Sequence, residues 1–72
     1  MNIEEKGKLK TLLNYWMDHN KEHSLEFREW AEKARSFGEA ELCEQVLQAA
    51  RAMDKASEFL SQALGKLEAK ER

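Results

Sequence analysis

The chain has 72 residues, of which 36% are charged, and its formal net charge is −2. A chain this short makes one domain over residues 1–72, and such a domain buries only about 60% of the surface that its unfolded chain exposes. Lys and Arg are interleaved with Glu along the sequence. This mixing favours a solvated helix surface and argues against nucleic-acid binding, which requires basic residues gathered on one face.

The first ten residues, MNIEEKGKLK, lack the apolar stretch of a signal peptide, and no apolar run approaches about 18 residues. We therefore expect neither an export signal nor a membrane span. Cys43 is the only cysteine, so no internal disulfide can form. A single thiol without an export signal indicates a reducing, cytoplasmic location.

The first predicted element is a helix over residues 3–37. The sequence contains no proline, and Gly38 stands near its midpoint, directly after an aromatic residue. Glycine at this place can end a helix, because it adopts the left-handed conformation without strain. Glu39 and Glu41 then supply negative charge, which favours a new helix N-terminus. The second predicted helix therefore covers residues 39–68.

Both predicted helices carry a heptad pattern, in which residues at alternating steps of four and three share one face. In the first helix this pattern comprises Leu9, Leu13, Trp16, Asn20, His23, Phe27, Trp30, Ala34 and Phe37. In the second helix it comprises Leu42, Val46, Ala49, Met53, Ala56, Leu60, Ala63 and Leu67. Two such patterns predict left-handed packing of one helix on the other. We call these positions the predicted seam. If the chain folds back at Gly38, the residue numbers of two facing seam positions sum to 76, as for Trp16 and Leu60.

Further apolar or small residues lie beside the predicted seam. This set comprises Leu12, Cys43, Leu47, Ala50, Ser57 and Leu64. The total apolar width exceeds the stripe that a two-helix hairpin buries. We therefore predict that these six residues form an interface, through which two hairpins pair as a coiled-coil-like four-helix bundle. Docking of a helical partner protein on the same residues is the alternative.

Two histidines and an asparagine lie between the tryptophans of the first helix. Asn20 and His23 fall in the predicted seam, where they would form a buried polar layer that fixes the helix register. His19 and His23 are four residues apart and share a helix face, which is the spacing of two zinc-binding imidazoles in helical metalloprotease motifs. Glu26 follows His23 by three residues and could supply an oxygen ligand. The alternative interpretation is thus a nickel or zinc site formed by His19, His23 and Glu26.

The sequence indicates no catalytic residue. Cys43 lies roughly 30 Å from His23 by helical rise, so the two cannot act as a Cys–His pair. The chain has no glycine-rich phosphate loop, and two helices offer little cleft for a substrate. We expect no enzymatic activity, and we expect Cys43 to pack as a small apolar residue.

The residues from Trp16 to Ala31 follow the pattern W-x-x-H-N-x-x-H-x-x-x-F-x-x-W-A. This pattern resembles a family of short, uncharacterised prokaryotic helical hairpins, whose members occur alone or joined to nickel or cobalt transport components. The resemblance covers most of the chain. It implies a helical hairpin and supports metal binding through His19 and His23, but it identifies no reaction.

The predicted fold is all-α, an antiparallel two-helix hairpin that dimerises into a four-helix bundle. The predicted function is that of a small, non-catalytic structural or interaction module without a cofactor. The alternative is a small metal-binding accessory protein that uses the two histidines.

Overall fold

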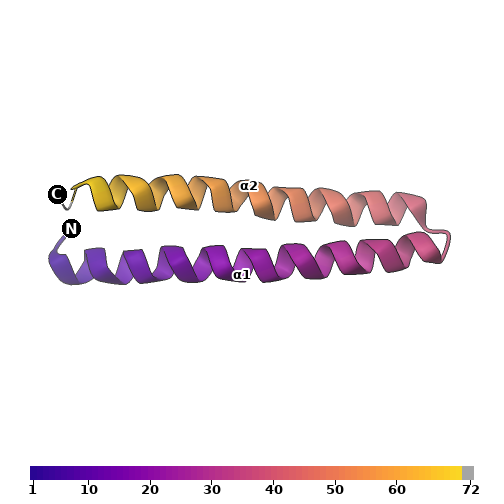
Figure 1. Cartoon of the computed structure of the whole chain (residues 1–72), viewed down its shortest axis with the longest axis horizontal. Coiled ribbons are helices and arrows are strands. Elements are labelled where there is room, and N and C mark those ends of the chain that lie inside the picture. The colour runs from indigo at the N-terminus through magenta and orange to yellow at the C-terminus, as the bar shows by residue number, and fades with distance from the viewer. Residues whose placement is uncertain (71–72) are drawn as a thin grey trace.

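The computed structural model describes residues 1–70 and consists of two antiparallel helices (Figure 1). Helix α1 covers Ile3–Ser36 and helix α2 covers Ala40–Lys70. They lie side by side along their length, in a rod with Cα extents of 53 × 15 × 14 Å. The predicted all-α hairpin is confirmed, and its helix bounds differ from the predicted ones by at most two residues.

The turn between the helices confirms the predicted role of Gly38. Its φ of 83° lies in the left-handed region, which glycine adopts without strain. Its N–H donates to the carbonyl of Arg35 at 3.0 Å, and the N–H of Glu39 donates to the carbonyl of Ala34 at 3.0 Å. This pair of bonds is a Schellman motif, which satisfies carbonyls that the end of α1 would otherwise leave unpaired.

Small side chains line much of the contact between the helices. The buried residues are Leu13, Ser24, Ala31, Ala34, Cys43, Ala50 and Leu67. Ala31 and Ala50 are fully excluded from solvent, and a cluster of Ala31, Ala34 and Cys43 packs against Val46 and Leu47. Helices approach one another more closely where the facing side chains are small. The hairpin is therefore closed by small residues rather than by aromatic rings.

The predicted seam is correct in some of its positions and wrong in others. Leu13, Ala34 and Leu67 are buried as predicted. The prediction is wrong for four large side chains, which are between 39% and 73% exposed: Trp16, Trp30, Phe37 and Leu42. Three of these residues directly precede one that faces the other helix, and consecutive side chains in an α-helix point about 100° apart. The large side chains therefore turn out of the contact onto one side of the hairpin.

The residues predicted as a dimer interface include a row spaced by seven: Cys43, Ala50, Ser57 and Leu64. The structure places this row between the helices rather than beside them, since Cys43 and Ala50 are buried and the other two are half-buried. Cys43 packs with Ala31 and Ala34 of α1, so the prediction that this row lies beside the helix contact is wrong. Leu47 is also partly buried, whereas Leu12 is exposed and its part in an interface stays a prediction.

Polar contacts join the helices along one edge of the hairpin. Arg28 Nη2 on α1 lies 2.6 Å from Asp54 Oδ2 on α2. The Ser24 hydroxyl donates to the Ala50 carbonyl at 3.4 Å. A hydrogen bond from Ser24 also lowers the pKa of the Asp54 carboxyl, and Arg28 adds to this effect. These contacts tie the centre of α1 to the centre of α2.

Two serines that face the helix contact provide a matched test of these bonds. Ser24 Oγ has acceptors on α2, whereas Ser57 Oγ is buried and has no hydrogen-bond partner within residues 1–70. Substitution of either residue by alanine gains the same helix propensity. Ser24→Ala should therefore unfold more easily than Ser57→Ala by about 1 kcal/mol, the net value of one hydrogen bond. Urea denaturation followed by circular dichroism measures the difference, and equal stabilities would contradict the bonding of Ser24.

The lowered pKa of Asp54 makes the stability of the hairpin depend on pH. Its folded-state pKa lies below the ordinary value of 3.8, so in acid the unfolded chain binds more protons than the folded chain. The stabilisation is thus complete above about pH 4 and is lost as the pH falls through the folded-state pKa. Asp54→Asn should lower the melting temperature at pH 7 and weaken its decline below pH 4. Asp18→Asn, at an exposed position of α1, is the control; a decline weakened equally by both would contradict this assignment.

Candidate functional site

The hairpin exposes an apolar face, which we call the heptad face. It consists of the predicted-seam residues that the helix contact does not bury: Leu9, Trp16, Asn20, His23, Phe27, Trp30 and Phe37 of α1, with Leu42, Val46, Ala49, Met53, Ala56, Leu60 and Ala63 of α2. All are exposed or half-buried. Trp30 and Phe37 line one pocket together with Leu42 and Val46, so residues of both helices share this side. The Arg28–Asp54 ion pair joins the two helices on the opposite edge of the hairpin.

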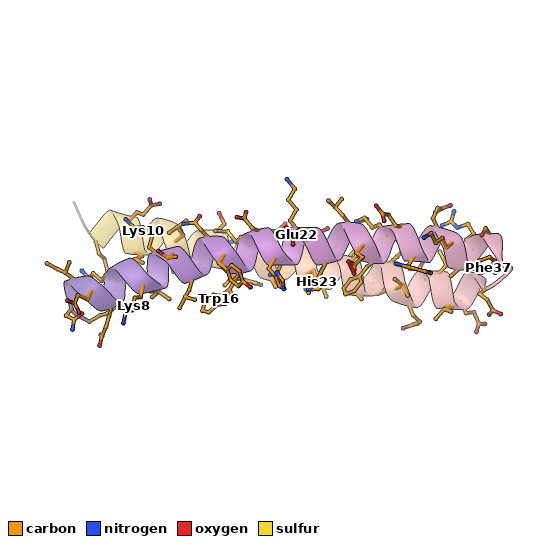
Figure 2. The ribbon with its side chains drawn as sticks, turned by 90° about the horizontal axis from the view of Figure 1, so that it is seen from below. Lys8, Lys10, Trp16, Glu22, His23 and Phe37 are labelled. Atoms are coloured by element: carbon orange, nitrogen blue, oxygen red, sulfur yellow. The ribbon has the colours of Figure 1, made fainter. Side chains whose placement is uncertain are left out.

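The two helices contribute side chains of different size to the heptad face. Helix α1 supplies large side chains, and Figure 2 shows Trp16 and His23 on the same side of this helix. Helix α2 supplies alanines at a seven-residue spacing, at positions 49, 56 and 63. Lys33 Nζ lies 4.0 Å from the centre of the Trp30 ring, a cation–π contact at the rim. The face is thus apolar over much of its length, with charge at its margin.

Four rings run diagonally across α1 toward the middle of the heptad face. Their centroids are separated by 5.4 Å from Tyr15 to His19, by 4.6 Å from His19 to His23, and by 6.0 Å from His23 to Phe27. Residues four apart are neighbours on a helix surface, which explains this contact series. Sequence reasoning identified the two histidines and placed Phe27 in the predicted seam, but it missed Tyr15 and the contacts between the four rings, although the same spacing of four links all of them.

One hairpin does not bury the predicted polar layer, and the polar residue that it does bury lies one position after His23. Asn20 and His23 are only half-buried. The polar residue that the helix contact buries is Ser24, which is 4% exposed. Asn20 and His23 instead form the polar middle of the heptad face.

The structure brings together two of the three predicted metal ligands. The rings of His19 and His23 are adjacent, and His19 Nδ1 lies 4.0 Å from Glu22 Oε2. In the part of the chain that the structure describes, no three His, Cys, Asp or Glu side chains are arranged to hold a metal ion. One hairpin therefore does not assemble a site from His19, His23 and Glu26, and a metal ion bound here would need ligands from outside the hairpin.

The thiol of Cys43 packs as a small side chain, as the sequence predicts. It is free and 2% exposed, and Arg35 Nη2 lies 3.7 Å from its sulfur. Sequence reasoning missed this Arg35 contact and the Arg28–Asp54 pair. Both depend on the side of the hairpin to which each long side chain turns, which heptad spacing alone does not specify.

Neither α1 nor α2 combines the length and apolar character needed to cross a membrane. No curated protein and no solved structure matches the chain. A family model, the domain of unknown function DUF8180, matches residues 9–67. The matched region holds the turn, the buried helix contact and the whole heptad face. The chain therefore belongs to the DUF8180 family.

Proposed function

We propose that this protein is a small, non-catalytic interaction module that associates with itself through the heptad face. The observation that carries the proposal is the exposure of Trp16, Trp30, Phe37 and Leu42 at regular heptad positions. Scattered apolar side chains are normal on a protein surface, but a continuous apolar face indicates an interaction site. In a four-helix bundle these heptad positions point into the central core.

Self-association would also compensate for the small apolar core of a single hairpin. Within residues 1–70 only six apolar residues are buried, and three of them are alanines. A domain of this size rarely gains enough stability from one core and is commonly completed by a partner subunit, a metal or disulfides. A second hairpin would extend the core without any disulfide. No cofactor or catalytic group enters this proposal, and a reducing cytoplasm suits the free thiol of Cys43.

Two exposed residues of α1 test the proposal as a matched pair. Trp30 on the heptad face is 57% exposed and Leu25 outside that face is 55% exposed, so either can become glutamate without loss of a buried side chain. The protein should sediment as a dimer at micromolar concentration. Trp30→Glu should weaken the dimer at least about 100-fold, because buried aromatic residues dominate interfaces and each dimer contains two copies. Leu25→Glu should have little effect.

Analytical ultracentrifugation across a concentration series measures both variants. A monomeric wild-type protein would overturn the proposal. Equal weakening by the two variants would show that the heptad face is not the interface. Association only with a larger helical protein would favour the docking alternative over self-association.

A second candidate function is a metal-binding accessory role, favoured by the 4.6 Å separation of the His19 and His23 rings. Nickel or zinc should then bind metal-free protein at a fixed ratio, with the remaining ligands supplied by a second copy, for example by its Glu26. His19→Ala and His23→Ala should each abolish binding. Isothermal titration calorimetry is the measurement, and the absence of saturable binding below about 100 μM would exclude this function.

A further inference from the structure

We infer that the occupant of the heptad face is a second copy of this chain running in the opposite direction, with its turn at the far end. The inference rests on the proposed self-association and adds the orientation of the two copies. Their two-fold axis would pass through the His23 layer and perpendicular to the helices. Each α1 would then lie against the other α1, and each α2 against the other α2.

The area of the face suits a complete hairpin as the partner. The heptad face runs from Leu9 to Phe37 on α1, about 42 Å at 1.5 Å per residue, and the hairpin is 15 Å wide, so the face covers about 630 Å² between Cα positions. This lies within the roughly 600–1,000 Å² that each partner contributes to a standard protein–protein interface. A single peptide helix would cover only part of the width, whereas a second hairpin matches both dimensions.

The side-chain charges at the two ends of the hairpin are complementary. Near the turn, residues 29–47 contain five acidic and two basic side chains, for a net charge of −3. At the open end, residues 1–10 and 66–70 contain three acidic and five basic side chains, for a net charge of +2. Opposed copies place each negative turn beside a positive open end, whereas copies in the same direction place like charges together. Charge complementarity of this kind selects the orientation of an interface.

The sizes of the side chains along the face favour the same orientation. The layer of His23 and Met53 lies at the centre, with Trp16 and Trp30 seven residues away on either side. Opposed copies place the Trp16 layer against the Trp30 layer, and the small layer of Asn20 and Ala56 against the layer that contains Phe27. Copies in the same direction would stack two small Asn20 layers and leave a gap, which close packing disfavours.

Electron paramagnetic resonance distances between labels on the two copies test the orientation. Cys43→Ala provides a background without a native thiol, and Ser36→Cys places one uncharged label site near the turn. Ser36 is exposed, and its substitution alters none of the charges used above. Residue 36 of one copy would face residue 10 of the other, so the expected separation is about 40 Å at 1.5 Å per residue. Copies in the same direction would give less than about 30 Å, since a bundle is only about two helix diameters across.

Glu22→Cys in the same background is the control, because residue 22 lies near the proposed axis and should give less than about 30 Å in either orientation. The inference is supported by a dimer with a short distance at position 22 and a distance of about 40 Å at position 36. A dimer with short distances at both positions overturns the orientation but leaves self-association standing. A wild-type chain that sediments as a monomer overturns the proposed function and this inference together.

Discussion

The close approach of α1 and α2 along a row of small side chains is the constraint on which the rest of this structure depends. Ser24, Ala31 and Ala34 face Cys43 and Ala50, and these five residues are nearly excluded from solvent. Side chains this small let the helices pack closely. They bury little apolar area, however, and hydrophobic stabilisation scales with that area at about 25 cal/mol per Å². Close packing therefore gives the hairpin a defined register without giving it a large core.

This constraint divides the surface of the hairpin into two unlike sides. On one edge, Arg28 and Asp54 can span the helices because their side chains reach around the small residues of the contact. On the other side, Trp16 and Trp30 cannot enter the contact and remain 39% and 57% exposed to solvent. The helices are amphipathic individually, and the hairpin that they form is amphipathic as a whole. In a helix pair of this kind the polar side chains of one edge are paired with each other, and the apolar face on the other side is available to bind another surface.

The fold could be predicted from the sequence because its main signals are local. A proline-free chain with one central glycine specifies two helices and a turn, and Gly38 has the required positive φ. The heptad pattern also identified which side chains prefer an apolar environment. It could not show whether that environment is the other helix or a second hairpin, because both bury residues at steps of three and four. The prediction therefore placed Trp16 and Trp30 where Met17 and Ala31 lie, one residue further along each turn. The seven-residue spacing of the small residues was visible in the sequence. What was missed is that these small residues, rather than the large ones, form the contact between the helices.

The same distinction changes what the central polar residues mean. Asn20 and His23 are half-buried in one hairpin, and there they retain access to water and have little influence on register. In the proposed dimer they lie inside the core, where a polar side chain must find a hydrogen-bond partner. His23 then meets its own copy at the two-fold axis, and His19 approaches Glu26 of the other copy. The proposed dimer is thus required both for a polar layer that excludes other registers and for a metal site whose missing ligands come from a second copy. The chemistry of the two histidines is therefore decided by the surface that covers the heptad face.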